Sequence, residues 1–364
     1  MSHKHTSTHC TIVPPHMLEH LARAAETHPE LAAFARSTLE HDASVRTKRR
    51  LTAVIGAPEA LARGVGADRP QRTIDAAHHK QILPGTQVRA EGGQESDDAA
   101  VNQAYDGLGD TFNLYLKAYG RNSIDGRGLP LVATVHYGEM YENAFWNGEQ
   151  MVFGDGDGTI FLDFTSCIDV IGHELTHGVT QYTANLNYYG QSGALNESLS
   201  DVFGTIIKQW VLGQTVEQAD WMIGAELLGP TVGGYNDSPR GLRSMKDPGT
   251  AYDDPRLGGK DPQPASMNGY VRTSADNGGV HINSGIPNRA FYLTAKAIGG
   301  NAWEKAGQIW YDTLTGGELA PDAQFADFAR LTVAAAKSRY GDQEEAKAVL
   351  DAWSQVGVPT NGSA

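Results

Sequence analysis

The pattern of apolar and polar positions separates a short helical segment from the rest of the 364-residue chain. Residues 1 to about 45 contain PPHMLEHLARAAETHPELAAFARSTLEHDASV, in which good helix formers carry apolar positions at helical spacing. A basic run, RTKRR (46–50), and an Ala-, Gly- and Pro-rich stretch to residue 71 follow, and this composition predicts an exposed linker. The basic run alone is typical of a solvated surface, but its position between two parts of the chain also fits a cleavage site.

Beyond Arg72 the pattern changes from strands to helices. Short apolar runs between turn residues predict strands in three segments, 129–138, 140–158 and 159–164. The segment 99–119 and most of the chain after Ser166 have helical spacing, broken by a Gly-, Pro- and Asp-rich stretch at about 229–290. The cluster Gly-Asp-Gly-Asp-Gly at 154–158 predicts a turn, with a calcium loop as the alternative.

Composition limits the class of partner. Hydrophobic residues make up 40% and charged residues 20% of the chain, values typical of a soluble globular protein. A net charge of −14 would repel a phosphate backbone, which argues against nucleic acid and, less strongly, against an anionic membrane surface. No segment approaches the roughly 20 apolar residues of a membrane span, and the N-terminus has no apolar run of signal-peptide length. We therefore expect synthesis in the cytoplasm, followed by retention there or secretion by a non-classical route.

Candidate metal ligands occur in VIGHELTHGVTQY (170–182). With only 2 cysteines in the chain, a metal must be bound by His, Asp or Glu. His173 and His177 are about one helical turn apart and project from the same face, although an ordinary solvated helix has the same spacing. Glu197, in GALNESLSD, can return on a second helix and complete the three protein ligands of a hydrolytic zinc site.

Two further carboxylates have positions that suit such a site. Asp201 lies one turn beyond Glu197 and can accept the second N–H of a ligating histidine. Glu174 faces differently from the two histidines and can take a proton from a water at the metal. The pattern therefore predicts a catalytic centre.

These motifs resemble those of the thermolysin family of zinc endopeptidases. HELTH and NESLSD stand at the family's spacing, and further similar segments follow the family's order: YENAFWNGEQMVFGDGDG (141–158), GLRSMKDP (241–248), DNGGVHINSGIPNRAFY (276–292) and AWSQVGV (352–358). The resemblance spans about Arg72 to Val358. It implies an α+β, two-lobed metalloprotease, with a β-rich N-terminal lobe (71–187) that includes the zinc helix and an all-α C-terminal lobe (188–364).

The resemblance also implies roles for individual residues in catalysis. The ligands of Zn²⁺ would be His173, His177 and Glu197. Glu174 would be the general base. His281 would hydrogen-bond the developing oxyanion, with Asp276 orienting its ring. Tyr188 would assist, although Tyr189 beside it is an alternative.

A peptide substrate would be held by a second group of residues, again by resemblance. Arg243 would hold the carbonyl beyond the scissile bond, and Asn143 and Ala144 would pair with substrate backbone by strand addition. The pocket would be lined by Phe161, Phe164, Val170, Ile223 and Leu242. All five are apolar, which implies cleavage on the N-terminal side of a hydrophobic residue, although such residues also form ordinary cores.

The resemblance fails at the family's double calcium site. Asp169 and Asp220 stand at two of its positions, but the other positions hold Lys208, Met222 and Ala225. Because a lysine repels the ion, we do not expect a double site, and a single calcium ion is the remaining alternative.

The N-terminal segment resembles the short pro-segment of the protealysin branch of this family, through Pro14, Pro15 and Leu18 of VPPHML. Two prolines fix an extended backbone at low entropic cost, which suits a segment that fills a cleft. We predict that residues 1–50 form a propeptide that inhibits the enzyme intramolecularly and is cut within about 46–70. A thiolate of Cys10 capping the zinc is a further hypothesis that the resemblance does not require.

The predicted function is a latent, monomeric zinc endopeptidase that acts on peptides or proteins and is open to a protein inhibitor. One alternative is a zinc-bound scaffold that binds without catalysis, but Glu174 and His281 would then have no purpose. The other is an exopeptidase, which would need a device that captures a free amine, and no motif for one occurs.

Overall fold

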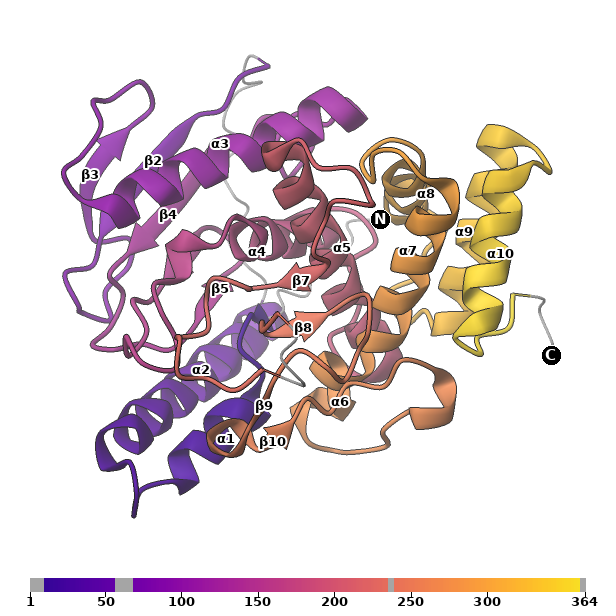
Figure 1. Cartoon of the computed structure of the whole chain (residues 1–364). Helices are drawn as coiled ribbons and strands as arrows, with labels where there is room; N and C mark the ends of the chain where they lie inside the picture. Colours follow the sequence, from indigo (N-terminus) through magenta and orange to yellow (C-terminus); the bar gives the residue numbers. More distant parts are fainter. Residues whose placement is uncertain (1–9, 56–67, 235–238, 361–364) are drawn as a thin grey trace.

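One six-stranded sheet organises the first half of the chain, and helices fill the second half (Figure 1). The computed structural model describes residues 10–55, 68–234 and 239–360, with the backbone alone for 46–55. The sheet has the strand order β1-β5-β6-β4-β2-β3. Its strands are β1 (Cys10–Thr11), β2 (Arg72–Ala76), β3 (Thr86–Ala90), β4 (Leu131–Val135), β5 (Ala144–Trp146) and β6 (Met151–Phe153). Two small ribbons pair β7 (Met222–Ile223) with β8 (Arg243–Ser244) and β9 (Asp253–Asp254) with β10 (Gly259–Lys260).

The helices divide between the N-terminal segment, called the leader from here on and described over residues 10–55, the sheet and the C-terminal half. They are α1 (Pro15–Arg23), α2 (Pro29–Ile55), α3 (Ala99–Tyr119), α4 (Ile168–Gln181), α5 (Gly190–Leu212), α6 (Asp276–Asn283), α7 (Gly285–Ile298), α8 (Lys305–Thr315), α9 (Phe325–Tyr340) and α10 (Glu344–Gln355). Helix α3 coincides with the predicted segment 99–119. It begins at Asp98, whose carboxylate accepts a hydrogen bond from the Ala100 amide, and ends at Gly120 with a left-handed φ of 67°.

The first strand comes from the N-terminal leader and forms one edge of the sheet. Strand β1 pairs antiparallel with β5, and Cys10 lies opposite Trp146 while Thr11 lies opposite Phe145. The next pair, β5 and β6, is also antiparallel, whereas β4 is parallel to both β6 and β2. The leader therefore continues the sheet that carries the predicted substrate strand.

Helices α4 and α5 approach closely because glycines face each other across the contact. A Cβ on Gly204 would lie 2.5 Å from the backbone oxygen of Asp169, and a Cβ on Gly172 would lie 2.5 Å from Ile207 Cδ1. No side chain fits at either position without moving its neighbour. This close approach sets the distance between the HELTH and NESLSD motifs, which lie on α4 and α5 respectively.

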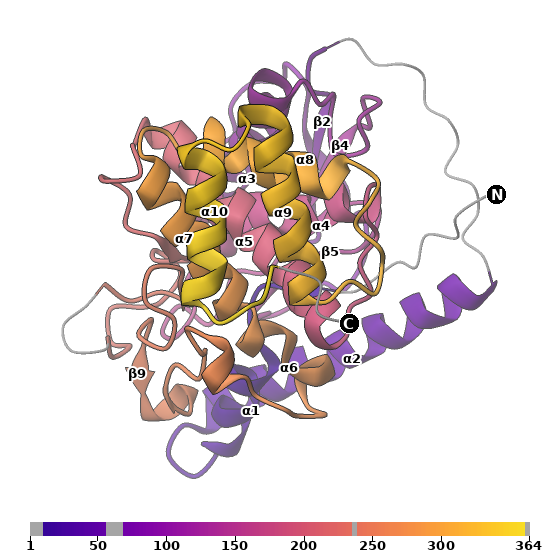
Figure 2. The same cartoon turned by 90° about the vertical axis from the view of Figure 1, so that its right-hand side faces the viewer.

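The leader packs on the rest of the chain through its two helices. Met17, Leu18 and Leu21 of α1 are buried and belong to the main hydrophobic core. In α2, Asp42 accepts hydrogen bonds from Tyr141 Oη at 2.5 Å and from Asn143 Nδ2 at 3.1 Å. The C-terminal end of α2 extends away from the body of the molecule (Figure 2).

Two local predictions are wrong. Residues 159–164 form no strand: Phe161 makes one isolated bridge with Leu228, because the Asp157 carboxylate accepts hydrogen bonds from the next backbone amides and turns the chain. Helix α2 also continues through RTKRR to Ile55, where the composition predicts a linker, because Arg, Lys and Leu favour helix. The remainder of that linker, 56–67, lies outside the described residues. Along the described ranges, no helix is both long and apolar enough to cross a membrane.

Candidate active site

Three predicted metal ligands converge between α4 and α5. His173 Nε2 and His177 Nε2 lie 3.0 Å apart. Each of these nitrogens is 3.5 Å from a carboxylate oxygen of Glu197. Atoms that bind one zinc ion tetrahedrally at about 2.0–2.1 Å lie roughly 3.3 Å from one another, so the spacing fits this ion.

The outer nitrogens of both rings are already engaged. His173 Nδ1 donates to Asp201 Oδ1 at 2.8 Å, and His177 Nδ1 donates to Asn196 Oδ1 at 2.8 Å. Both Nε2 atoms are then lone-pair acceptors that face each other in a buried space. Glu197 Oε2 is buried there too and accepts no hydrogen bond from the part of the chain that the structure describes. A cation resolves this crowding of acceptors, so the residues present fit zinc.

Electrostatics favour neutral histidine and charged carboxylate at this site. Burial lowers the pKa of His177 well below its usual value, which keeps the imidazole neutral as a metal ligand must be. Burial would raise the pKa of Asp201, but the guanidinium of Arg243 and the bond from His173 hold it well below its ordinary value. Asp201 is therefore ionised, and Arg243 Nε and Nη2 both donate to it at 2.8 Å.

The predicted base, Glu174, lies beside the histidine pair. A carboxylate oxygen of Glu174 is within 4.8 Å of a ring nitrogen of both His173 and His177. Glu174 Oε2 also accepts a hydrogen bond of 2.9 Å from the backbone amide of Trp146 in β5. Strand β5 thus helps to hold the orientation of this carboxylate.

His281 lies in α6, whose first residues have an unusual backbone geometry. Asp276, Asn277, Gly278 and Gly279 all have φ between 49° and 85°, the left-handed region. This bend lets Asp276 accept bonds from both the backbone amide of His281, at 2.8 Å, and its Nδ1, at 2.6 Å. Burial alone would lower the pKa of His281, but the Asp276 and Glu197 carboxylates raise it to about 9. The ring is therefore a double donor at neutral pH.

Tyr188 and Tyr189 differ in their surroundings. The hydroxyl of Tyr188 donates a short hydrogen bond to Glu197 Oε1 and lies 3.2 Å from His281 Nε2. Burial and the Glu197 charge raise the pKa of Tyr188 well above its usual value, so it stays a donor. Tyr189 is 62% exposed. Of the two, Tyr188 has the geometry of an oxyanion donor.

The leader lies across this centre. His281 Nε2 donates to the Thr11 carbonyl at 3.0 Å, and Arg243 Nη1 donates to the Ile12 carbonyl at 3.0 Å. The Ile12 amide donates to the Ala144 carbonyl at 3.2 Å, and the Val13 amide donates to Asn143 Oδ1 at 3.0 Å.

The prolines that follow continue this path. Pro14 is extended, with φ −62° and ψ 140°, and Pro15 opens α1, where its missing N–H costs nothing. Leu18 is fully buried. All three residues of the predicted propeptide motif thus lie against the body of the enzyme.

The residues predicted to line the substrate pocket are buried in one continuous core with the leader. Phe161, Phe164, Val170, Ile223 and Leu242 are at most 1% exposed. The rings of Phe161 and Phe164 lie 6.1 Å apart. Ile12 and Val13 belong to the same core. The assignment of the five residues named first to a specificity pocket stays a prediction.

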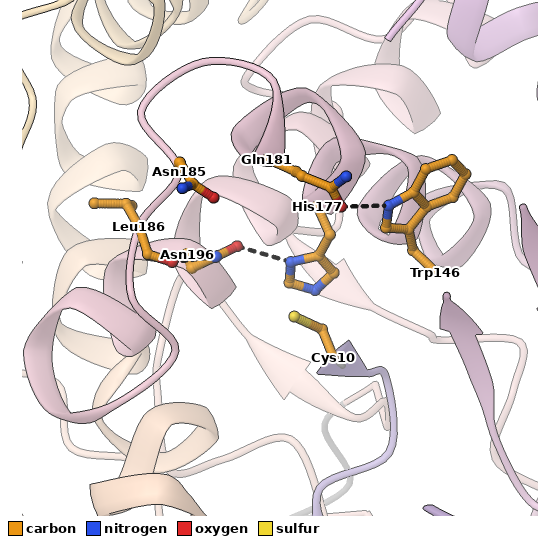
Figure 3. Close-up of a pocket in the computed structure, with 7 residues that line it drawn as sticks. All are labelled: Cys10, Trp146, His177, Gln181, Asn185, Leu186 and Asn196. Atoms are coloured by element: carbon orange, nitrogen blue, oxygen red, sulfur yellow. Dashed lines mark hydrogen bonds between the residues drawn. The ribbon is translucent and has the colours of Figure 1, made fainter. Parts of the chain in front are cut away.

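A small cavity beside the His177 ring contains Cys10. Figure 3 shows the Cys10 sulfur directed toward this ring, with Trp146 and Asn196 on either side. The Asn196 side chain was not predicted from the sequence, although it directly precedes Glu197 in the NESLSD motif. Asn288 was also missed: its Nδ2 donates to Asp201 Oδ2 at 2.8 Å. Asn288 lies within the segment 276–292 that resembles the family, but no role for it was predicted.

Lys208 contacts the two carboxylates at predicted calcium positions, Asp169 and Asp220, and a third carboxylate, Glu226. Lys208 Nζ lies 3.5 Å from Asp169, 3.1 Å from Asp220 and 3.5 Å from Glu226. Burial opposes the charge, but these three carboxylates raise the pKa of Lys208 above its ordinary value. A fixed ammonium therefore lies among these carboxylates and offsets part of their negative charge.

Comparison with known proteins assigns the chain to a class. The chain matches the thermolysin metallopeptidase catalytic domain over residues 65–181 and the alpha-helical domain of the same peptidases over residues 184–358. The chain belongs to the thermolysin family of metallopeptidases. It is thus a metalloprotease, and membership of this family implies zinc.

Particular relatives are similar over almost the whole chain. An extracellular metalloprotease of Pectobacterium carotovorum subsp. carotovorum is 52% identical over 349 residues, which cover 96% of each protein. Protease PrtS of Photorhabdus sp. (strain Az29) is 46% identical over 95% of this chain and 91% of its own length. The solved precursor of protealysin, a metalloproteinase from Serratia proteamaculans, aligns with a TM-score of 0.85 and 52% identity over 96% of this chain and 99% of its own. This similarity to a precursor supports a latent form that contains a propeptide.

Proposed function

We propose that the chain is the precursor of a zinc endopeptidase that cuts on the N-terminal side of hydrophobic residues. His173, His177 and Glu197 bind the metal in this proposal, and Asp201 fixes the ring of His173. Zinc, when bound, polarises the scissile carbonyl and makes the attacking water more acidic.

The residues of the chain then carry the proton and the developing charge. Glu174, held by the Trp146 amide, accepts the proton of the attacking water and later delivers it to the leaving amine. His281 and Tyr188 donate hydrogen bonds to the oxygen on which negative charge develops. Asp276 keeps the His281 ring in position.

The contacts of the leader carry this proposal. Thr11 and Ile12 present consecutive carbonyls to His281 and Arg243, and Ile12 and Val13 present consecutive amides to Ala144 and Asn143. A peptide substrate in the same direction would place its scissile bond where the leader has Thr11–Ile12. The side chain after the cut would then replace Ile12 in the apolar core, which supports a hydrophobic preference at that position.

Replacement of the base tests the mechanism. Glu174→Gln preserves the shape and loses the carboxylate, so the variant, once its leader has been cut by an added protease, should retain one zinc per chain and lose at least 10²-fold in kcat. Metal content and the hydrolysis rate of a peptide with a Gly-Leu bond test the role of Glu174. Comparison with a peptide that has a Gly-Asp bond tests the preference for a hydrophobic residue. Turnover within a few-fold of the unaltered enzyme would contradict the role of Glu174, and faster cleavage before Asp than before Leu would contradict the preference.

Calcium, assembly and location complete the proposal. The ammonium of Lys208 among three carboxylates supports the absence of a double calcium site and leaves at most one weaker ion elsewhere. We propose that the enzyme acts as a monomer and is subject to a protein inhibitor. Relatives named as extracellular metalloproteases support action outside the cell.

A further inference from the structure

The leader presents a peptide bond to the catalytic groups in the direction proposed for a substrate. Its Thr11 carbonyl faces His281 and its Ile12 carbonyl faces Arg243, both at 3.0 Å. Steric blocking explains why other peptides are kept out, but it does not explain why the bond between Thr11 and Ile12 would survive. A latent precursor therefore needs a feature that withholds the attacking water.

The residue before Thr11 supplies a donor at the metal site. The Cys10 sulfur, a ring nitrogen of His177 and a carboxylate oxygen of Glu197 all lie within 4.8 Å of one another. Cys10 is 2% exposed and is not part of a disulfide. Figure 3 shows its sulfur directed toward the edge of the His177 ring that is away from Asn196.

A second observation points to a ligand at the same place. Glu197 Oε2 is fully buried and accepts no hydrogen bond from any residue in the described ranges. The Nε2 atoms of both histidines face this space, because their Nδ1 atoms are bonded to Asp201 and Asn196. Two nitrogens, one carboxylate and one sulfur are a donor set that zinc binds well.

We propose that Cys10 is the fourth zinc ligand of the precursor, so that its thiolate occupies the position that water needs for catalysis. This inference rests on the proposed function. On binding, the S–H bond breaks and its proton passes to solvent, while a sulfur electron pair forms the bond to zinc and no redox change occurs. Release of the leader withdraws the sulfur and frees the position for water.

The register of the leader gives this ligand its geometry. Pairing of Cys10 with Trp146 and of Thr11 with Phe145 fixes the β1 backbone against β5. Alternate side chains of a strand point to opposite faces, so a shift by one residue would turn the sulfur away from the metal. The same pairing that places the Thr11 carbonyl at His281 therefore also directs Cys10 at the zinc site.

X-ray absorption at the zinc edge tests the proposal on the full-length chain. Glu174→Gln serves as background so that the leader stays attached, and intact mass confirms this in every sample. We expect one sulfur neighbour at about 2.3 Å, with the remaining nitrogen and oxygen neighbours at about 2.0–2.1 Å. Cys10→Ser should lose the sulfur neighbour, whereas Cys167→Ser, which alters the other buried cysteine, should keep it.

The outcomes separate this inference from the proposed function. One bound zinc with only nitrogen and oxygen neighbours in the full-length chain would overturn the Cys10 assignment alone. This measurement needs no variant of Cys10, so it holds even if Cys10→Ser fails to fold. Failure of the chain to bind zinc would overturn both proposals. In the background with Glu174 restored, Cys10→Ser should cut its own Thr11–Ile12 bond at least tenfold faster, which appears by mass as a new N-terminus at Ile12. An unchanged rate would contradict the protective role.

Discussion

Arg243 Nη1 donates a hydrogen bond to the carbonyl of Ile12, 231 positions earlier in the chain. The same guanidinium donates twice to Asp201, which in turn accepts from His173. One buried network therefore joins the leader, the predicted substrate arginine and a predicted metal ligand. The leader is recognised by the groups that would recognise a substrate, so its affinity and the catalytic geometry depend on common residues.

Ile12→Ala should weaken docking of the leader. The side chain is fully buried, and its truncation removes about 2–5 kcal/mol of packing. A larger share of precursor then has an open cleft, and the leader should be lost at least tenfold faster, as followed by gel electrophoresis at fixed concentration. Arg23→Ala, which alters a side chain 69% exposed on α1, is the control. Equal rates for the two variants would refute this contribution of Ile12.

Tyr188→Phe should lower kcat of the processed enzyme by about 10²–10³, the usual loss for one oxyanion donor. Tyr189→Phe should leave kcat within twofold, because Tyr189 is largely exposed. Peptide hydrolysis and zinc content of both variants are measured together, so that loss of metal is separated from loss of the donor. A larger loss of kcat for Tyr189→Phe would transfer the role to that residue.

Lys208→Ala should destabilise the fold by about 3–5 kcal/mol, because it leaves the buried Asp169 without its cation. Added Ca²⁺ should raise the melting temperature of this variant and have little effect on the unaltered chain. Lys296→Ala removes an ion pair whose side chains are 29% and 69% exposed, and should cost about 1 kcal/mol or less. A large drop in the melting temperature of the unaltered chain on adding a calcium chelator would show that a bound ion, rather than Lys208, offsets the charge of the cluster.

His136 should make stability depend on pH. Its Nδ1 bonds Asp155 at 2.9 Å and its Nε2 bonds Asp98 at 2.8 Å. The hydrogen bond to Asp155 raises the pKa of His136 to about 9, against partial burial. The pKa of His136 in the folded chain is thus raised above the ordinary value of 6.5. The contribution of its charge to the free energy of unfolding is therefore complete below pH 6.5 and is lost as the pH rises to about 9.

Melting temperatures of His136→Gln and the unaltered chain at pH 6 and pH 10 test this contribution. The melting temperature of the variant should lie well below that of the unaltered chain at pH 6 and close to it at pH 10. His28→Gln, at an exposed position of the leader, should show no such change. A deficit for His136→Gln that is the same at both pH values would assign the effect to packing instead of charge.

Motifs with fixed spacing could be predicted from the sequence, and contacts that depend on the fold could not. The two histidines one turn apart indicated α4, and helical spacing indicated α3 with correct bounds. Asn288 contacts Asp201 only because α7 packs against α5, and no local pattern reveals such packing. The strand predicted at 159–164 failed because a single carboxylate, Asp157, turned an otherwise strand-like run.

In the leader, too, some features could be predicted from the sequence and others depend on the fold. Its helices follow from periodicity, and the resemblance of Pro14, Pro15 and Leu18 indicated a segment that fills the cleft. The two residues of β1 are too few to produce a strand pattern, and their pairing with β5 depends on long-range contacts. The direction of the leader and the position of the Cys10 sulfur therefore became visible only in the folded chain.

Latency through the leader is the central claim, and simultaneous measurement of processing and activity tests it most directly. Full-length chain is incubated with zinc, and aliquots are analysed for intact mass and for hydrolysis of a peptide with a Gly-Leu bond. The account predicts that the rate rises in proportion to the fraction of chains that have lost the leader and extrapolates to nearly zero for intact chains. Full activity in a sample whose chains all retain the leader would contradict it.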